Sequence, residues 1–269
     1  MPKVSFVMPV KNGEKFIKNT ISSLLNQTFS DLEIVAVNDH SEDNTLNILK
    51  EIAKQDERLK VLNMEDKTGI AAGRNLGTQN ANGEIILPTD ADDPCYPERA
   101  TISIEELEKN KADVFYANLM RVYSDTGKKV LRHFQPYDKE MLRYINFIGH
   151  GASAFYKKVY DTAGPYDESI LIGEDYDFFL TAEESGFKFT SKNIPVSQYT
   201  MHPGQTTGVV NDAEKIKKRQ LWNKKVREKH SIYNVDPEYV RKNGTPEVVD
   251  FYVNSNYEIW FGQESIPTK

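Results

Sequence analysis

The stretch GEIILPTDADDPCYPE, residues 83–98, runs from an apolar segment into a cluster of acidic residues. The apolar segment is short and is followed by polar residues, which is typical of a buried strand. Three carboxylates then fall close together, at Asp90, Asp92 and Asp93. Carboxylates held this close repel one another. The stretch therefore predicts a strand that ends either in a solvated acidic turn or in a site where a cation is bound.

The chain before this stretch alternates between strand and helix patterns. The patterns follow in the order strand 3–10, helix 14–27, strand 32–39, helix 43–55, strand 59–64, helix 69–81 and strand 83–90. Repeated β-α units of this length predict a parallel sheet with right-handed crossovers. Ligands of such sheets bind beyond the carboxyl ends of the strands. We therefore expect the polar residues that follow the strands to meet along one edge: Asn12, Asp39, residues 67–69 and Asp90.

Composition and missing motifs argue against several classes of protein. The chain has 269 residues, of which 39% are hydrophobic and 28% charged, as in an ordinary globular protein. Its net charge of −6 argues against a nucleic-acid surface, and no apolar run has the length of a membrane span. It contains no G-x-G-x-x-G or P-loop sequence. The N-terminus enters a strand pattern with no signal-like segment, and the single Cys95 fits a reducing compartment, so we expect a cytoplasmic protein.

The second half of the chain is less regular. Its patterns are, in order, a hairpin at 113–134, a strand, helix and turn at 150–170, an acid-led helix at 173–187, a basic helix at 216–230 and an aromatic tail from 236. The hairpin pattern surrounds the turn sequence SDTGK. We expect the tail to fold back on the protein or to mediate assembly, including a homodimer.

The acidic cluster admits two chemical interpretations. In an extended backbone, residues two apart point to the same side, so Asp90 and Asp92 would aim at one point and Asp93 elsewhere. Two hard oxygen ligands with room for water and phosphate oxygens suit Mg²⁺ or Mn²⁺, which would neutralise the charge of a departing diphosphate. The alternative is an acidic turn ahead of a helix started by Pro97. Spacing alone leaves both open.

Other polar residues also have a plain structural alternative to a role in a site. Asp39 could bind a base or ribose, or it could form a turn or helix cap. Arg74 could reach a phosphate or base edge, or form a surface ion pair. Glu174 and Asp175 begin a helix with an aromatic face, where a carboxylate could act as a general base or complement the helix dipole. His202 could be a third metal ligand, a phosphate contact or neither.

Five segments together resemble family 2, the large family of inverting nucleotide-sugar glycosyltransferases with the GT-A fold. They are VSFVMPVKN, IVAVNDHSEDNT, GIAAGRNLG, GEIILPTDADDP and GPYDESILIGEDYDFFL, which occur in the family's order within residues 3–205. The resemblance implies an α/β, Rossmann-like GT-A domain over residues 1–210, with a mostly parallel central sheet flanked by helices. Its nucleotide-binding half would be 1–95 and its acceptor and catalytic half 96–210. Residues 211–269 would form a helical or irregular C-terminal extension.

The resemblance also implies roles for individual residues. The nucleotide pocket would be lined by Pro9, Val10, Asn12, Asp39, Arg74, Asp90 and Ala91. The metal ligands would be Asp92 and Asp90, and we add His202 on its chemistry. Asp175 would be the catalytic base, with Glu174 beside it orienting the acceptor or the sugar. Asn38 departs from the family pattern, because an acid is commoner at this position.

We therefore expect a metal-dependent, inverting hexosyl- or N-acetylhexosaminyltransferase that uses Mn²⁺ or Mg²⁺. It would move one sugar from a nucleotide-diphosphate sugar, with UDP as the default, to a hydroxyl of a glycan or lipid-linked acceptor. The chain lacks the Gln-x-x-Arg-Trp signature of processive synthases, which RQLWN at 219–223 resembles only faintly, and this favours a non-processive enzyme. Two alternatives stay open: a non-catalytic sugar- or nucleotide-binding relative, and a metal-dependent nucleotidyltransferase. The basic helix is either a solvated face or a peripheral contact with the inner face of an anionic membrane.

Overall fold

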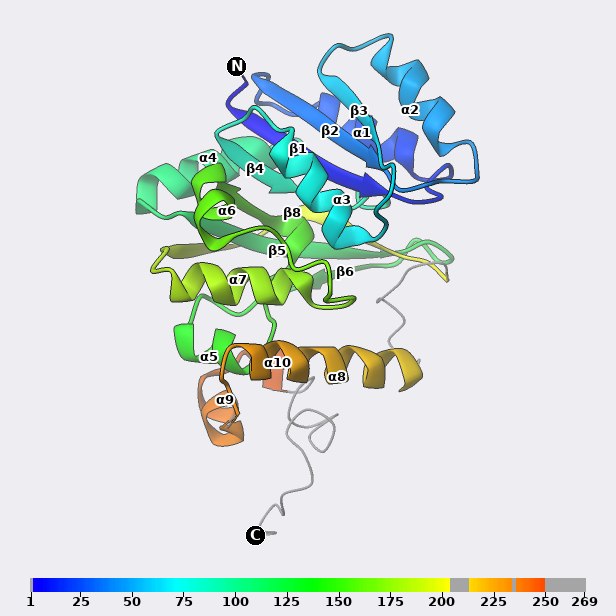
Figure 1. Cartoon of the computed structure of the whole chain (residues 1–269). Coiled ribbons are helices and arrows are strands. Elements are labelled where there is room, and N and C mark those ends of the chain that lie inside the picture. The colour runs from blue at the N-terminus through cyan, green and yellow to red at the C-terminus, as the bar shows by residue number, and fades with distance from the viewer. Residues whose placement is uncertain (1, 204–212, 234–235, 250–269) are drawn as a thin grey trace.

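A mixed eight-stranded sheet forms the centre of the protein, whose computed structural model describes residues 2–203, 213–233 and 236–249 (Figure 1). The strand order is β3-β2-β1-β4-β7-β5-β6, and β8 pairs with β5. The strands are β1 (Val4–Val10), β2 (Leu32–Asn38), β3 (Leu59–Asn63), β4 (Ile85–Pro88), β5 (Val114–Tyr123), β6 (Lys129–Arg132), β7 (Ser153–Tyr156) and β8 (Phe189–Met201).

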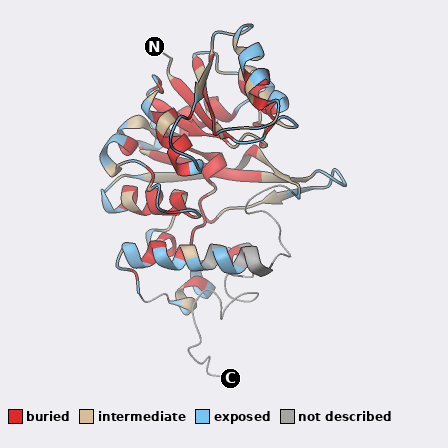
Figure 2. Cartoon of the chain, turned by 45° about the vertical axis from the view of Figure 1, so that its right-hand side comes forward, coloured by how far each residue is buried: buried red, intermediate tan, exposed pale blue. Residues whose placement is uncertain are grey.

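The first four strands are parallel to one another, as the alternating patterns predict. Along β1, Phe6 and Met8 enter the core on one side of the sheet and Val7 enters the core on the other, because successive strand residues point to opposite faces. Figure 2 shows these buried strands in red between the flanking helices. Helices whose apolar residues pack on the Phe6 side are α1 (Ile17–Leu25), α2 (Thr45–Ala53) and α4 (Arg99–Asn110).

Helix α3 (Ile70–Gln79) packs unusually close to the sheet on the opposite face. A Cβ atom added at Gly77 would lie 2.5 Å from a Val7 methyl carbon, and one at Gly73 would lie 2.9 Å from the Cβ of Pro9. Only residues without a side chain allow this approach. It holds Arg74, which follows Gly73, at the carboxyl end of β1.

The second half of the sheet contains one strand that the sequence patterns do not predict. The hairpin of β5 and β6 is antiparallel as expected, and β7 pairs antiparallel with both β4 and β5. The additional strand, β8, runs parallel to β5 and contains Pro195, near which the pairing register shifts. Proline donates no ladder hydrogen bond and interrupts the strand pattern. The missed strand matters because it carries the chain to Thr200 and His202, beside the acidic cluster.

The remaining helices form a layer that begins against the sheet and continues away from it (Figure 1). They are α5 (Lys139–Tyr144), the short 3₁₀ helix η1 (His150–Ala152), α6 (Lys157–Ala163), α7 (Glu174–Glu184), α8 (Ala213–Lys229), α9 (Pro237–Asn243) and α10 (Pro246–Val249). The acid-led helix α7 starts directly after Gly173, whose φ of 90° is in the left-handed region that favours glycine. Helix α8 packs on α7 and contributes the buried Val226 to the core.

The start of the C-terminal tail folds back on the protein. The Tyr239 hydroxyl of α9 donates to both carboxylate oxygens of Asp138, at 3.1 and 3.0 Å. The rest of the aromatic tail, residues 250–269, and with it the expected homodimer contact, lies outside the described residues. Among the described helices, none is long and apolar enough to cross a membrane.

Candidate active site

A cavity of about 610 Å³ opens at the carboxyl ends of the parallel strands. All of the residues that the sequence assigns to a site line it, although they come from both halves of the chain. They are Pro9, Val10, Asn12, Asp39, Arg74, Asp90, Ala91, Asp92, Glu174, Asp175 and His202. The strand-end argument is therefore confirmed for Asn12, Asp39 and Asp90, which line one cavity. The chemical roles of all these residues stay predictions.

At one end of the cavity, the loops after β1, β2 and β3 are tied together. Asp39 is buried, and its carboxylate accepts hydrogen bonds from the Thr68 hydroxyl at 2.7 Å and from the Gly69 N–H at 2.8 Å. The Asn12 N–H donates to the Ser41 hydroxyl at 2.9 Å. Asp39 thus organises the rim of this end as well as lining it.

The acidic cluster is a turn, so the expectation of an extended backbone there is wrong. The Asp93 N–H donates to the Asp90 carbonyl at 3.2 Å, which closes a turn directly after β4. Asp90 and Asp92 still line the cavity but have different partners. Asp90 accepts from Arg74 at 3.3 Å, and Asp92 contacts His202 Nε2 at 2.9 Å. Asp93 also lines the cavity, but it is buried and accepts from the Thr200 N–H at 2.7 Å, so its partner differs from those of the other two acids.

A buried arginine of α4 holds the base of this turn. Arg99 is fully buried and donates to the Pro88 carbonyl at 2.6 Å and to the Ser153 carbonyl at 3.2 Å. It also donates to the Thr89 hydroxyl at 3.1 Å and to the Cys95 sulfur at 2.9 Å. Arg99 therefore fixes the end of β4, and no sequence motif identifies it, because its partners come from three separate segments.

The electrostatics of the turn favour a bound cation. Burial raises the pKa of Asp92, and the charge of Asp90 raises it further, whereas the hydrogen bond to His202 opposes the shift. Burial and the charges of Asp92 and Asp90 raise the pKa of Asp93 well above its ordinary value. The described part of the chain nevertheless holds no group of three His, Cys, Asp or Glu side chains that could bind a metal ion. A cation at Asp92 and His202 would need further ligands from a bound molecule or from water.

The two acids at the start of α7 have different surroundings. Glu174 is buried and forms an ion pair with the buried Arg74. Burial raises the pKa of Glu174 to about 7, against the lowering effect of Arg74. Asp175 is half-buried, and its Oδ1 accepts from the Tyr176 N–H at 2.8 Å and from the Asn146 side-chain amide at 3.3 Å. Two neutral donors orient the Asp175 carboxylate, whereas the Glu174 carboxylate forms an ion pair with Arg74.

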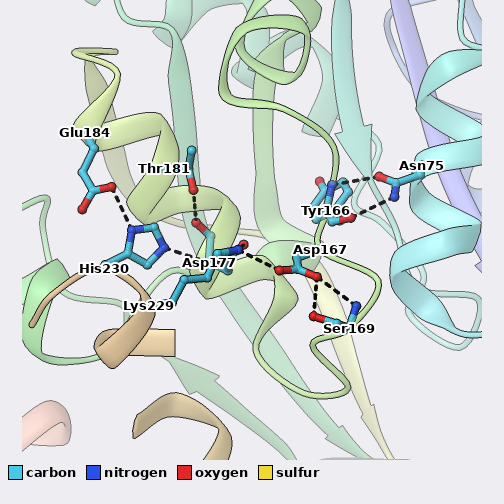
Figure 3. A network of polar contacts seen from close by, with 9 residues as sticks. All are labelled: Asn75, Tyr166, Asp167, Ser169, Asp177, Thr181, Glu184, Lys229 and His230. Carbon is cyan, nitrogen blue, oxygen red and sulfur yellow. Dashed lines mark hydrogen bonds and ion pairs between the residues drawn. The ribbon is translucent and has the colours of Figure 1, made fainter. Parts of the chain in front are cut away.

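Several residues of the cavity wall escape the sequence patterns. His150 of η1 contacts the Tyr166 hydroxyl at 2.9 Å, and burial, aided by Arg74 and Arg99, keeps its pKa well below the ordinary value. Tyr166 is in turn held by Asn75, which donates to its carbonyl at 2.9 Å and accepts from its N–H at 2.8 Å (Figure 3). These contacts join η1, α3 and the segment before α7, so no local spacing reveals them.

The sequence also matches known proteins. Residues 5–162 match the model of glycosyl transferase family 2. An uncharacterized glycosyltransferase of Haemophilus influenzae is 28% identical over 82% of this chain and 73% of its own length. The uncharacterized glycosyltransferase EpsJ of Bacillus subtilis is 31% identical over 78% of this chain and 64% of its own length. The chondroitin synthase of Pasteurella multocida is 28% identical over 88% of this chain, which spans only 24% of that protein.

Solved structures share the fold. The 1–349 fragment of TarS from S. aureus, in complex with UDP-GlcNAc, matches 96% of this chain and 80% of its own with a TM-score of 0.66 and 19% identity. The mannosyltransferase PcManGT from Pyrobaculum calidifontis, in complex with GDP-Man and Mn²⁺, matches 96% of this chain and 70% of its own with a TM-score of 0.62 and 15% identity. At these identities the likeness shows the fold alone. With the family match over more than half of its length, the chain belongs to glycosyl transferase family 2 and has the GT-A fold.

Proposed function

We propose that the protein transfers one sugar from a nucleotide-diphosphate sugar, with UDP as the default base, to a hydroxyl of a glycan or lipid-linked acceptor. The transfer inverts the anomeric carbon, depends on Mn²⁺ or Mg²⁺, and is non-processive. The named relatives support a glycan as the acceptor, because two of the matches are a chondroitin synthase and a hyaluronan synthase, both of Pasteurella multocida.

The observation that carries the proposal is that Glu174 and Asp175 have different surroundings and can therefore have different roles. Glu174 is buried against Arg74, so it serves to position the start of α7. Asp175 lines the cavity with a half-buried carboxylate that Asn146 helps to orient. A carboxylate in this setting can take a proton from an attacking hydroxyl, provided that the hydroxyl lies within hydrogen-bond reach.

The residues of the acidic turn fit a divalent cation. His202 Nε2 lies 2.9 Å from the Asp92 carboxylate, Asp90 precedes Asp92 in the same turn, and burial makes this concentration of charge costly. Oxygen and imidazole ligands suit Mn²⁺, and oxygen ligands suit Mg²⁺. A bound ion would offset the negative charge of the departing nucleoside diphosphate.

In the proposed reaction, residues of the chain provide the base and the walls of the cavity. Asp175 accepts the proton of the acceptor hydroxyl while the hydroxyl oxygen bonds to the anomeric carbon. The bond between that carbon and the diphosphate oxygen breaks on the opposite face, and this single displacement inverts the anomer. The loops at Asn12, Asp39 and Thr68 lie at the end of the cavity that would receive the nucleotide.

A binding panel tests the proposal directly. UDP, GDP and dTDP are added to the protein with Mn²⁺, with Mg²⁺ or with EDTA, and the melting temperature Tm is measured. A ligand at about 100 times its Kd stabilises a protein by about 2.7 kcal/mol, which raises Tm by about 5 °C in a chain of this size. The nucleotide that binds is then supplied as its sugar conjugates, and release of the nucleoside diphosphate is followed.

The outcomes separate this proposal from its alternatives. Metal-dependent binding with release of the nucleoside diphosphate supports a transferase. Binding without any release supports a non-catalytic relative, and release of pyrophosphate from a nucleoside triphosphate and a sugar phosphate supports a nucleotidyltransferase. If no nucleotide changes Tm under any condition, the donor site is wrong.

One surface feature supports a lipid-linked acceptor. Helix α8 exposes Lys217, Lys218, Lys224 and Lys225 together with Leu221, which is 54% exposed. Lysines beside an exposed apolar residue suit the surface of an anionic membrane. Co-sedimentation with vesicles of phosphatidylcholine, with and without phosphatidylserine, tests this part. Equal sedimentation with both vesicles, or no sedimentation with either, would leave the basic face as solvated surface.

A further inference from the structure

Helix α8 reaches the cavity although it lies beyond the segment that matches the family model. Its residue Asn223 lines the same cavity as Glu174 and Asp175. Asn223 is only 1% exposed, and its amide nitrogen has no hydrogen-bond partner among the residues that the structure describes. A buried polar group without a partner is uncommon, because it loses its hydrogen bonds to water and gains none in return.

Asn223 packs against the backbone that starts the catalytic helix. A Cβ atom added at Gly173 would lie 3.1 Å from the Asn223 side-chain oxygen, so the two residues are in close contact. Glu174 and Asp175 follow Gly173 immediately. The Asn223 amide is therefore placed beside the two acids, in a residue that lines the cavity.

The position of α8 is fixed by a network of charged contacts at its C-terminal end (Figure 3). Lys229 contacts Asp167 at 2.8 Å and Asp177 at 2.8 Å. His230 contacts Asp177 at 3.0 Å and Glu184 at 2.8 Å. Asp177 and Glu184 belong to α7, and Asp167 lies in the segment that leads into it. The network thus holds α8 on the helix that carries Asp175, and this fixes the position of Asn223.

The chemistry of the amide indicates the kind of ligand. A neutral carboxamide offers two N–H donors and one acceptor, which suits the hydroxyls of a sugar and gives no preference for a charged group. Asn223 belongs to α8, which lies on the far side of α7 from the sheet (Figure 1). The end of the cavity proposed to receive the nucleotide is instead formed by the loops after β1 and β2. The ligand at Asn223 is therefore a sugar next to the base and not the nucleotide.

We propose that the Asn223 amide donates a hydrogen bond to a hydroxyl of the acceptor sugar, a hexopyranose, beside Asp175. Helix α8 is then a part of the active site and not an appendage to it. This inference rests on the proposed glycosyl transfer, since it names a residue that binds the acceptor in that reaction.

The test compares two variants with the wild-type protein. Asn223→Ala removes the amide, and Asn223→Leu replaces it by an apolar group of similar size. Glu228→Ala is the matched control, because Glu228 is exposed on the same helix. Donor hydrolysis without acceptor and transfer to the methyl glycosides of glucose, galactose, N-acetylglucosamine and glucuronic acid are measured with the nucleotide sugar that binds best.

We expect both Asn223 variants to raise the KM of the preferred glycoside by about tenfold, as the loss of one hydrogen bond would. Nucleoside-diphosphate binding and donor hydrolysis should match those of the wild type and of Glu228→Ala. The Tm should not fall in Asn223→Leu, because the amide nitrogen it removes makes no hydrogen bond with the described residues. A merely structural role would instead lower Tm and affect hydrolysis and transfer alike.

Three results would overturn the inference: an unchanged KM for the glycoside, an equal loss of donor hydrolysis, or a wild type that hydrolyses donor but transfers to none of the four glycosides. Failure of the proposed function looks different. In that case the wild type would neither hydrolyse a nucleotide sugar nor transfer from it, whatever residue stands at position 223.

Discussion

Arg74 on α3 and Glu174 at the start of α7 form a buried ion pair between residues 100 positions apart in the chain. The two side chains are 5% and 8% exposed, and Arg74 also reaches Asp90 at 3.3 Å. The pair therefore connects the helix that follows β3, the acidic turn after β4 and the helix that carries Asp175. The placement of Asp175, the proposed base, therefore depends on a contact between two segments that lie far apart in the chain.

Removing Arg74 should destabilise the fold. In Arg74→Met the buried Glu174 loses its ion-pair partner, and breaking a buried pair from one side costs about 3 kcal/mol or more. Urea unfolding of the wild type and the variant measures the difference. Arg58→Met is the control, because the Arg58 and Asp56 side chains are 32% and 25% exposed and such a pair contributes about 1 kcal/mol at most. If the two variants lost equal free energy of unfolding, burial of the Arg74–Glu174 pair would not determine its contribution to stability.

The loss in Arg74→Met should also depend on pH. Burial raises the pKa of Glu174 to about 7 from its ordinary 4.5 even when Arg74 is present. Without the opposing charge, Glu174 keeps its proton in the folded protein and loses it in the unfolded chain. The folded state then binds more protons above about pH 4.5, so its stability falls as pH rises. We expect the deficit of the variant to be smaller at pH 5 than at pH 8, and a deficit that does not change would place Glu174 in a more polar setting.

Asp175→Asn should abolish most of the turnover and leave donor binding intact. The loss of a general base costs about 10²–10⁴-fold in rate. The asparagine is nearly isosteric and can still pack beside Asn146 and Tyr176, so the Kd of the nucleoside diphosphate should not change. Single-turnover rates and calorimetric titration measure the two quantities. Asp161→Asn, a change on the exposed side of α6, serves as the control, and normal turnover in Asp175→Asn would remove Asp175 from the role of base.

The sequence predicts the parts of the fold that local patterns specify. The apolar runs of β1 to β4 and the helices between them have a clear periodicity, and parallel strands must bring their carboxyl ends to one edge. That reasoning also places Asn12, Asp39 and Asp90 at one edge, whereas Arg74 and Asp175 are assigned to the site by the family resemblance. The sequence identifies the residues of the cavity better than their partners: Arg74 could have been a surface residue, and no pattern in α3 shows that it is buried against Glu174 of α7.

The remaining features depend on contacts between distant segments. Strand β8 contains Pro195, so its pattern does not identify it, and its pairing with β5 is what brings His202 to Asp92. The extended backbone expected at Asp90 fails because β4 ends at Pro88 and the chain turns at once. Asn223 is not identified by a motif, since RQLWN at 219–223 resembles the signature of processive synthases only faintly. Its place in the cavity follows only from the packing of α8 on α7.

The acids of the turn should differ in their effect on metal binding. Asp92→Asn and His202→Ala should each remove the dependence of UDP binding on Mn²⁺, because these two side chains lie together in the cavity. Asp93→Asn should keep that dependence, since Asp93 is buried and accepts from the Thr200 N–H of β8. Calorimetric titration of UDP with and without Mn²⁺ measures the dependence. A loss in Asp93→Asn equal to that in Asp92→Asn would contradict the division of roles.

The contact between α7 and α8 should weaken as pH rises, through His230. Burial lowers the pKa of His230, but its hydrogen bonds with Asp177 and Glu184 outweigh burial and raise the pKa above the ordinary value of 6.5. The folded state therefore binds the proton more tightly than the unfolded chain, and the stabilisation is complete below about pH 6.5 and is lost as pH rises through the folded pKa. His230→Gln should reduce the free energy of unfolding by about 1–2 kcal/mol at pH 6, as expected for hydrogen bonds between charged groups, and by less at pH 8. Urea unfolding across this range measures the difference, with His133→Gln as a control imidazole outside the α7–α8 contact. A difference that grows with pH would mean that His230 is neutral in the folded protein and that Lys229 alone supplies the positive charge at this contact.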